Sequence, residues 1–490
     1  MTQSAYIPFG GGIDLVSPPR EMKPGSCFYA VNYECPVTGG YRRVDGYTQI
    51  GSTLPGTGAV LGVKTFNDKQ YAIRAKDSDT ASLYVFDGDS WTPVDGGDGT
   101  LTVGRYEFIE GNLYATDSKH ALYFVGGGEP WELSVDGTLT KLDNAPTGAQ
   151  FIAIHQNHII LGFEPGSLMF SGVGEPNQWD ASTDGAGEIG VGSAITGLIS
   201  GRGDVLHVGC DNSMQGLYGT SSQNFQMKTT LPASGCKRYS LQSMMEPYFV
   251  GERTITSLKA SSDFGDFTPF QAGAKIEPLF TEEGYAGRIT ASMVSKQRAQ
   301  YRVFFDDKTG VFYSPTGATT IEFLHQVMAT DTAELDSGEE FMMFGDDEGN
   351  VFRLGAGAES FAGEAIRAFV TTAYTDLKST QTVKRFRRAF LDINNSGGSK
   401  ISVKANLDYG GVGAPNHNRY FIDYMPKGGL WSVDKWDEFA WSSPMMASEP
   451  IAITGSGQSI NFAIYSDEIS PSHSIYGYTI NFDPRRLRRG

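Results

Sequence analysis

Two short clusters of basic residues stand out in an acidic chain, which has 39 lysines and arginines against 56 aspartates and glutamates. They are VKRFRRAF at 383–390, with Lys384, Arg385, Arg387 and Arg388, and the C-terminal DPRRLRRG, with Arg485, Arg486, Arg488 and Arg489. Guanidinium groups form paired hydrogen bonds with carboxylates, so all eight cations are candidates for assembly or docking onto an acidic partner. Solvated strand and tail charge is the alternative, and phosphate binding is a third. In a regular strand, Lys384, Phe386 and Arg388 would share one face, and Arg385 and Arg387 the other.

Histidine is the residue type that most often serves acid–base catalysis and metal binding, and the chain has seven. His155, His158 and His207 lie in strand-like contexts, where a single histidine is more typical of a packed core or surface position. Residues three apart in a strand point to opposite faces, so His155 and His158 are expected to be poor co-ligands. No P-loop, HExxH, GxSxG or dinucleotide-binding motif is present. We therefore expect no enzyme, no catalytic residue, no cofactor and no metal site.

Three acidic turns could suggest calcium: DGDS at 87–90, FDDKTG at 305–310 and GDDEGN at 345–350. None completes the ligand spacing of a calcium loop. Asp and Asn also favour hairpin turns, because their side chains bond to the local backbone and they tolerate left-handed conformations. We interpret all three as turns.

Composition predicts a chain made mostly of strands. The 490 residues include 61 Gly, 23 Tyr and 30 Phe, and 40% of the residues are hydrophobic. A formal net charge of −17 argues against tight non-specific binding of DNA, although an acidic surface can let a polyanion pass without adsorbing. The four cysteines include no CxxC pair, so we expect buried thiols, with a Cys27–Cys35 disulfide as the alternative.

A loose repeat begins near residue 60: a strand, a turn rich in Asp, Gly or Asn, and a second strand. It recurs at 69–94, 112–142, 157–180, 204–227, 247–267, 300–315 and 340–355. The spacing of 40 to 55 residues is that expected of propeller blades, which bury both faces of each sheet by stacking around an axis. We expect an all-β fold with a β-propeller of six or seven blades at 61–355; a tandem array of β-sandwiches is the alternative.

The flanking regions lack this rhythm. Residues 1–60 are expected to form an extended arm that packs with the C-terminal domain. Residues 356–490 have long alternating strands and are expected to form a β-rich domain involved in ring assembly or docking. The N-terminus lacks a signal peptide, and no apolar run approaches the ~20 residues that span a bilayer. We expect synthesis in a cytoplasm and no membrane span.

Several motifs resemble a family of tail proteins of double-stranded DNA phages. They are GGIDLVSPPREMKPGSCFYAVNYECPVTGGYRRVDGY at 11–47, MFSGVGEPNQWD at 169–180, SKQRAQYRVFFDDKTG at 295–310, MFGDDEGNVFRLGAGAESFAGEAI at 343–366 and KRFRR at 384–388. The order and extent of these motifs resemble the nozzle or hub proteins of short-tailed phages, also called packaged-DNA stabilisation proteins. The C-terminal region matches only weakly.

The resemblance implies a virion protein of the phage tail, with subunits that form a ring, commonly a hexamer, below the portal and adaptor proteins. The ring would line the DNA channel, retain the packaged genome and allow its ejection, with DNA passing through the lumen without specific binding. The family offers no catalytic residues. Two other functions stay open: a propeller at the tail tip that binds a host glycan, and a glycan-cleaving enzyme. The enzyme would bring two carboxylates, or a Tyr with an Arg cluster, together at the propeller axis. Trp431, Trp436 and Trp441 either bind a sugar or partner or pack in the C-terminal core.

Overall fold

The computed structural model describes residues 2–113, 119–182, 185–201, 204–260, 267–395, 399–408, 419–424 and 447–487. The chain divides into two compact units. The propeller unit comprises Gln49–Thr309 and Leu324–Arg353, and the sandwich unit comprises Met1–Thr48, Gly310–Phe323 and Leu354–Gly490. The boundaries expected from the sequence were 60/61 and 355/356. The structure places the first at 48/49, and it assigns Gly310–Phe323, which we expected within the propeller, to the sandwich unit.

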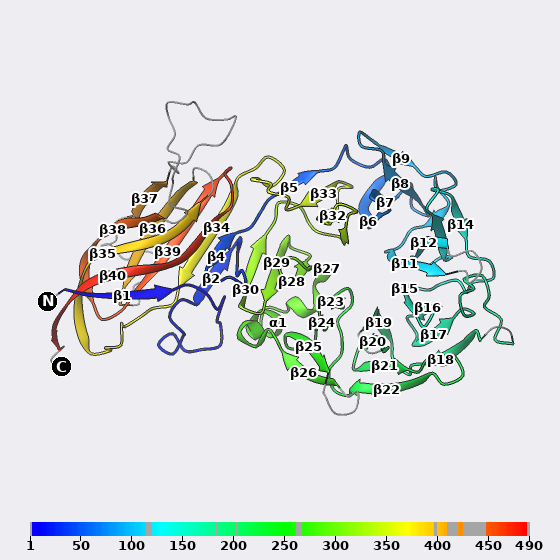
Figure 1. The fold of residues 1–490 in the computed structure, drawn as a ribbon, viewed down its shortest axis with the longest axis horizontal. Coiled ribbons are helices and arrows are strands. Elements are labelled where there is room, and N and C mark those ends of the chain that lie inside the picture. Colours follow the sequence, from blue (N-terminus) through cyan, green and yellow to red (C-terminus); the bar gives the residue numbers. More distant parts are fainter. Residues whose placement is uncertain are drawn as a thin grey trace. The chain divides into compact units, whose positions relative to one another are not determined.

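The propeller unit begins with five consecutive antiparallel sheets of four or five strands, each built from neighbouring strands in the sequence (Figure 1). The first two contain β6 (Thr57–Phe66), β7 (Lys69–Ala75), β8 (Thr80–Phe86), β9 (Trp91–Pro93) and β10 (Leu101–Thr102), then β11 (Glu107–Leu113), β12 (Lys119–Val125), β13 (Trp131–Ser134) and β14 (Leu139–Lys141). The third and fourth contain β15 (Phe151–His155), β16 (His158–Phe163), β17 (Ser167–Phe170) and β18 (Gly187–Gly190), then β19 (Ile195–Ser200), β20 (Leu206–Cys210), β21 (Met214–Tyr218) and β22 (Gln226–Leu231). The fifth contains β23 (Gln242–Ser243), β24 (Pro247–Val250), β25 (Ile255–Ala260) and β26 (Phe267–Gln271).

Two further groups of strands complete the propeller unit. A short helical stretch contains η1 (Ala274–Ile276), α1 (Glu277–Thr281) and η2 (Tyr285–Gly287), and leads to β27 (Ile289–Ser295) and β28 (Gln300–Phe305). The last group is β31 (Ala329–Glu334), β32 (Glu340–Gly345) and β33 (Val351–Leu354). Within the described residues, seven strands thus begin a group: β6, β11, β15, β19, β23, β27 and β31. This topology confirms the expected all-β, propeller-like fold, and each quoted copy of the sequence repeat includes the second strand of one group.

The middle strands carry continuous runs of buried residues, because both faces of a sheet are buried, each against a neighbouring sheet. One cluster joins the first and second sheets, with Leu83, Phe124 and Trp131, and another joins the third and fourth, with Ile160, Phe170 and Val208. Turn residues set the hairpins: Asn67 and Asp68 between β6 and β7 both have positive φ, the conformation of a tight two-residue hairpin.

The propeller closes between its first and last groups of strands. Val60 and Val63 of β6 pack in one core with Phe341 and Met343 of β32. In addition, Asp331 of β31 accepts a hydrogen bond from the Thr65 backbone N–H at 2.7 Å. Residues about 270 positions apart in the sequence therefore complete the ring, which a stack of separate sandwiches would not require.

The sandwich unit packs two sheets against each other. One has the order β3–β4–β40–β35–β38, with β1 also paired to β40; the other includes β29, β30, β2, β34, β39, β36 and β37 in that order. The bounds of the N-terminal strands of this unit are β1 (Gln3–Pro8), β2 (Cys27–Val31), β3 (Tyr33–Glu34) and β4 (Tyr41–Arg43), and the inserted segment carries β29 (Thr309–Ser314) and β30 (Gly317–Glu322). β5 (Tyr47–Gln49) instead belongs to the sheet of β31, β32 and β33. The C-terminal strands are β34 (Ile366–Thr372), β35 (Thr382–Asn395), β36 (Ser399–Leu407), β37 (Arg419–Tyr424), β38 (Ala447–Gly457), β39 (Ile460–Glu468) and β40 (His473–Leu487).

The two sheets of the sandwich unit bury their inward residues between them. Phe462 of β39 lies edge-to-face on Tyr478 of β40, with ring centroids 4.6 Å apart, and both are buried. The N-terminal segment is not a free arm, because β1 pairs with β40 along its whole length, from Gln3 opposite Phe482 to Pro8 opposite Gly477. Both ends of the chain are therefore built into one sheet.

A buried arginine joins the N-terminal strands to the C-terminal ones. Arg43 of β4 is fully buried and donates hydrogen bonds to the backbone oxygens of Glu468 and Ser470, the first at 2.9 Å. Nearby, the Tyr33 hydroxyl lies 2.8 Å from Nε2 of His473. All four cysteines are free and buried, so the disulfide alternative for Cys27 and Cys35 is not realised.

Candidate functional site

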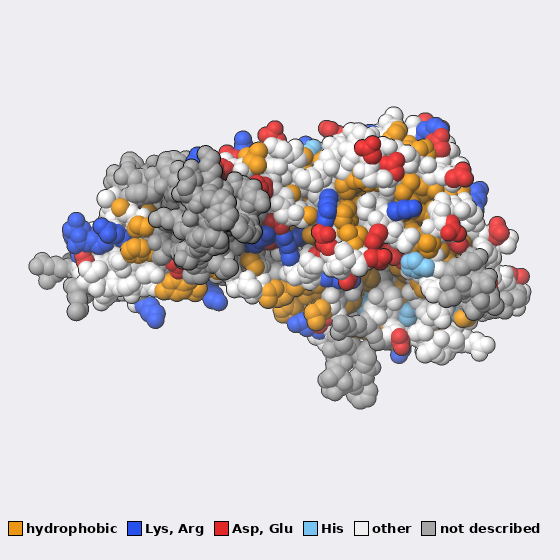
Figure 2. Space-filling view, turned by 45° about the horizontal axis from the view of Figure 1, so that its top comes forward, with side chains coloured by type: hydrophobic (Ala, Val, Ile, Leu, Met, Phe, Trp, Pro, Cys, Tyr) orange, Lys and Arg blue, Asp and Glu red, His pale blue; other side chains and the backbone are white. Residues whose placement is uncertain are grey.

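The two basic clusters, which lie about 100 residues apart in the sequence, are brought together on neighbouring strands. β35 pairs antiparallel with β40, and Arg385 lies opposite Asp483 in this register. Arg385, Arg387, Arg388 and Arg485 are exposed. We call these four residues the arginine patch. Figure 2 shows Lys and Arg side chains gathered at the left, where Figure 1 draws the ends of the chain.

One carboxylate lies within the arginine patch. Asp483 of β40 accepts hydrogen bonds from Nε of Arg387 and from the Thr2 hydroxyl, both at 2.8 Å, and Nη2 of Arg387 lies 2.7 Å from it as an ion pair. These bonds lower the pKa of Asp483 below its ordinary value, with Thr2 the largest cause. The pair holds Arg387 in place, while Arg385, Arg388 and Arg485 extend the positive surface around it.

The expected division of the first cluster into two faces is wrong at Arg388. The pairing of β35 shifts register between Phe386 and Arg388, which is a β-bulge, so Arg387 and Arg388 are both exposed. A bulge inserts one extra residue and reverses the alternation beyond it. Phe386 and Ala389 accordingly both point into the core.

Lys384 is not a docking residue. It is 1% exposed, and its ammonium group donates to the backbone oxygens of Ser379, Thr382 and Gln458 at 2.6, 3.2 and 2.8 Å. Burial lowers its pKa, and Asp376 and Asp408 oppose that effect. The side chain of Arg486, and Arg488 and Arg489 entirely, lie outside the described residues, as do Trp431, Trp436 and Trp441.

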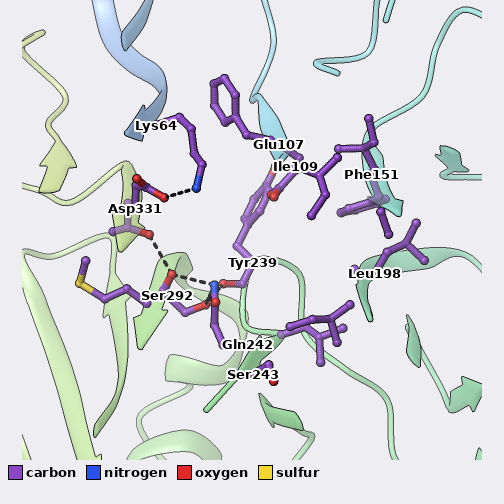
Figure 3. A pocket seen from close by; sticks show the side chains of 18 of the residues that line it. Lys64, Glu107, Ile109, Phe151, Leu198, Tyr239, Gln242, Ser243, Ser292 and Asp331 are labelled. Atoms are coloured by element: carbon purple, nitrogen blue, oxygen red, sulfur yellow. Dashed lines mark hydrogen bonds and ion pairs between the residues drawn. The ribbon is translucent and has the colours of Figure 1, made fainter. Parts of the chain in front are cut away.

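The propeller unit contains a second candidate site, a cavity of about 330 Å³ lined by residues of all seven strands that begin a group (Figure 3). One side is polar. Lys64 of β6 pairs with Asp331 of β31 at 3.0 Å and with Glu110 of β11 at 3.1 Å. Burial lowers the pKa of Lys64, but the two carboxylates outweigh it and raise that pKa above its ordinary value. The other side is apolar and includes Ile109, Phe151 and Leu198.

Two arginines flank Tyr239 of this cavity: Arg105, which also lines it, and Arg238. The guanidinium carbons of Arg105 and Arg238 lie 4.7 and 5.2 Å from the centre of the Tyr239 ring. Burial raises the pKa of Glu107, which the two guanidinium groups partly offset. Tyr239 has φ of +61°, a left-handed conformation that a bulky side chain rarely adopts. The bond from the Ser292 hydroxyl to the Tyr239 backbone oxygen, at 2.6 Å, helps to hold it.

Both guanidinium groups donate hydrogen bonds to residues from other groups of strands. Arg105 donates to the backbone oxygens of Thr290, at 3.0 Å, and Met328. Arg238 donates to the side chains of Gln150 and Glu164, the latter at 3.3 Å. They therefore connect segments that belong to different groups of strands. Sequence reasoning missed this group; its only signal is the run RYEF at 105–108, with charged and aromatic residues alternating at the start of an inner strand.

The three acidic segments form turns in the structure, as the sequence predicted. Asp87 accepts from the backbone N–H groups of Asp89 and Ser90 at 2.9 and 2.7 Å, and Asp346 accepts from that of Asn350 at 2.6 Å. Asp307 likewise accepts from Thr309 at 3.2 Å. In the described part of the chain, no group of three or more His, Cys, Asp or Glu residues is arranged to hold a metal ion, and no helix is long and apolar enough to cross a membrane.

The expectation that His155 and His158 point to opposite faces is wrong. His155 ends β15 and His158 begins β16, and the two lie directly opposite each other across the hairpin. The intervening Gln156 and Asn157 both have positive φ, so the chain reverses within two residues. Two residues on facing strands at the same register point to the same side of the sheet.

No protein-family model matches the sequence, and neither does any curated protein. Solved structures are similar to the chain only at low identity. The Raptor protein of Chaetomium thermophilum is 10% identical over 64% of this chain and 30% of its own, with a TM-score of 0.43. The extracellular domain of the putative hybrid two component system BT4673 from B. thetaiotaomicron is 11% identical over 70% of this chain and 45% of its own, with a TM-score of 0.44. The computationally designed Ika8 protein is 14% identical, covering 63% of this chain and 99% of its own, with a TM-score of 0.40. This chain thus spans less than half of the first two.

Proposed function

We propose that this protein is a structural component of a phage tail, a nozzle or hub subunit that assembles into a ring, commonly a hexamer, below the portal and adaptor proteins. The observation that carries the proposal is the arginine patch, four exposed cations on two adjacent strands of a chain with a formal net charge of −17. Such a patch complements an acidic surface, and another copy of this acidic chain offers one. A heterologous contact of this kind forms a ring where the rotation between neighbouring copies closes. The sequence resemblance to the nozzle family supports the same role.

The acidic charge suits a protein that surrounds DNA without binding it. A duplex carries one negative charge per ~1.7 Å of its axis, so an acidic lumen repels it at every point and opposes adsorption. In this proposal the ring retains the packaged genome in the virion tail and then lets it pass. The protein is made in the host cytoplasm and acts in the particle.

The experiment replaces two arginines of the patch. Arg385→Ala with Arg387→Ala removes two exposed positive charges from β35, while the inward residues of that strand remain. We expect the double variant to keep its thermal transition but to lose ring formation, alone or on a portal–adaptor complex, as seen by negative-stain microscopy and native mass spectrometry. Particles carrying it should package DNA and then lose it.

A matched control is Arg367→Ala with Lys400→Ala. These cations are exposed on β34 and β36 of the same unit, and each pairs with a surface carboxylate, Asp467 at 3.7 Å and Glu468 at 3.8 Å. The control makes the same change of net charge and should form rings normally. Normal rings from the Arg385/Arg387 variant would reject the docking role, and equal loss in both variants would reduce it to an effect of net charge.

A second function, glycan binding or cleavage, is favoured by one observation: Tyr239, Arg105 and Glu107 line the propeller cavity and Arg238 packs on the Tyr239 ring, so a tyrosine, two arginines and a carboxylate lie close together. Both guanidinium groups already donate hydrogen bonds within the protein, which weighs against binding or cleavage of a glycan by this group. Saturable binding of host-surface sugars, or hydrolysis of aryl glycosides that is lost in Glu107→Gln, would support this function. Turnover equal in the wild type and the variant would eliminate cleavage at this site.

A further inference from the structure

The first strand of the sandwich unit lies at the margin of its sheet. β1 pairs with β40 along its whole length (Figure 1), yet none of its six residues is buried, and Tyr6 is 51% exposed. The strand is therefore held mainly by backbone hydrogen bonds. It can leave β40 without opening the core between the two sheets.

One buried aromatic residue anchors the end of this strand. Phe9 is buried, and its ring centre lies 5.9 Å from that of Tyr41 and 5.5 Å from that of Tyr478. Its backbone N–H donates to the oxygen of Tyr476 at 2.8 Å. We call residues 2–9 the leading segment. It combines a row of backbone bonds with one side chain in a pocket, which is how an added strand is recognised at a sheet edge.

Three consecutive glycines follow the leading segment. Gly10, Gly11 and Gly12 have φ of +145°, +95° and +68°, values that glycine adopts without strain. A Cβ at Gly10 would meet nothing within 4 Å, whereas one at Gly12 would collide with the backbone of Ala318. Gly10 donates one backbone hydrogen bond, to Gly25 at 3.0 Å. Gly10 and Gly11 can therefore act as a hinge that redirects the leading segment while the chain from Gly12 onward stays in place.

The leading segment begins beside the arginine patch. Gln3 lies opposite Phe482 of β40, and the Thr2 hydroxyl donates to Asp483, the carboxylate that also pairs with Arg387. Eight extended residues reach about 27 Å, so a copy of the chain that docks on the patch comes within reach of this segment.

Apolar side chains are exposed around the same segment. Of the twelve large hydrophobic side chains that are exposed in the described part of the chain, five fall within residues 1–40: Tyr6, Leu15, Val16, Tyr29 and Val37. Val37 lies in the turn between β3 and β4, and Gly40 of that turn donates to the Phe9 backbone oxygen at 3.2 Å. Exposed apolar side chains gathered in one region mark a contact surface, and a neighbouring copy would cover them.

We propose that neighbouring copies in the ring exchange the leading segment, so that residues 2–9 of one copy pair with β40 of the next. The proposal rests on the proposed function, because it requires a head-to-tail ring.

Exchange conserves every contact that the leading segment makes, since the edge of β40 and the Phe9 pocket are the same in every copy. Once its own segment has left, β40 presents unpaired backbone groups that serve as a template for the segment of the neighbour. The cost is then confined to the glycine hinge, which makes exchange an inexpensive route to assembly. Each copy becomes tied to two others, and dissociation requires a strand to be removed from a sheet.

The experiment uses disulfide cross-links between β1 and β40. Ser4 and Asn481 lie directly opposite each other; Ser4 is exposed and Asn481 half-buried, and the four native cysteines are buried. Opposed residues of an antiparallel pair lie within disulfide range. Rings of the variant Ser4→Cys with Asn481→Cys are purified, mildly oxidised and run on a denaturing gel without reductant. We expect a ladder of covalent oligomers up to the size of the ring.

A mixed assembly makes the test sharper. When Ser4→Cys and Asn481→Cys are co-expressed as separate chains, each chain carries one of the two cysteines. A disulfide between the two kinds of chain, identified by mass spectrometry, then requires exchange. The control is Thr371→Cys with Ala463→Cys, a directly opposed pair on β34 and β39 of the same unit. This control should close within one chain and migrate as a monomer.

The outcomes separate this proposal from the proposed function. Rings that are cross-linked only within chains would overturn exchange and leave the ring function intact. A ladder that stops at the dimer would indicate reciprocal exchange between two copies, and would also overturn exchange around a ring. Absence of any assembly, alone or on a portal–adaptor complex, would reject both proposals. If the cysteine variants fail to assemble, Tyr6→Cys with Thr479→Cys, the next opposed pair with the same orientation, repeats the test.

Discussion

The propeller unit and the sandwich unit bury their strands by different routes. In the propeller unit, hairpins join neighbours in the sequence, and the long-range step is the closure of β31 and β32 on β6. In the sandwich unit, β40 lies between β4 and β35 and also pairs with β1, so nearly every sheet contact joins distant parts of the chain. A local error should therefore weaken one sheet of the propeller, whereas loss of one terminal strand should dismantle the sandwich.

The largest effect is expected from removal of β40, which tests whether the sandwich unit depends on one terminal strand. A chain that ends after residue 472 leaves β1 without a partner strand and splits the rest of the sheet into the pairs β3–β4 and β35–β38, and we expect the sandwich unit to lose its fold. Limited proteolysis with mass spectrometry should then cut between 366 and 407, before it cuts the propeller unit. A chain that ends at Leu487 retains all of β40 and serves as the control. Equal protease resistance of the two truncated chains would show that β40 is dispensable.

The next largest effect is expected at the closure of the propeller. Asp331→Ala leaves the ammonium group of Lys64 with Glu110 as its one carboxylate and removes the acceptor of the Thr65 N–H bond. Breaking a largely buried pair on one side should cost about 3 kcal/mol of unfolding free energy. Chemical denaturation followed by fluorescence measures it. The control is Glu334→Ala, an exposed position on the same strand; a similar loss in both variants would contradict a special role of Asp331.

A smaller effect is expected from one methyl group between two loops of the propeller, one after β20 and one between β22 and β23. A Cβ at residue 235 would lie 1.7 Å from the backbone oxygen of Asp211, so Gly235→Ala must push the backbone apart. We expect a loss of about 2 kcal/mol. A Cβ at residue 190 meets nothing within 4 Å, so Gly190→Ala should leave the denaturation midpoint nearly unchanged. If Gly235→Ala proves as stable as Gly190→Ala, the close approach is not real.

The smallest effect on stability is expected in the arginine patch. Arg387→Ala removes a surface ion pair with Asp483, and solvent screens such pairs. The shift of the thermal transition should be close to the error of calorimetry, in contrast to the loss of ring formation proposed for the double variant. A large shift would mean that the patch stabilises the sandwich unit and is not primarily a docking surface.

Much of the propeller could be predicted from the sequence, because its signals are local. Alternating apolar residues such as those of β7 and β8 predict strands, and Asp and Asn at the turns predict hairpins, without knowledge of distant residues. The candidate site was predicted less well. The bulge at Arg387 and the burial of Lys384 depend on how β35 pairs with β38 and β40, and a run of basic residues carries no signal for that pairing. The hydrogen bonds of Arg105 and Arg238 were missed because their acceptors lie in other groups of strands, far away in the sequence.

The sequence by itself determined the strand-rich character, the positions of most hairpins and the acidic charge, because these depend on residue type and near neighbours. The tertiary structure alone decided three things: that two basic clusters about 100 residues apart form one patch, that both chain ends enter one sheet, and that β31 and β32 close the propeller on β6. Each of these depends on register and on contacts between distant strands, and the energy of such contacts is not encoded in any single stretch of the chain.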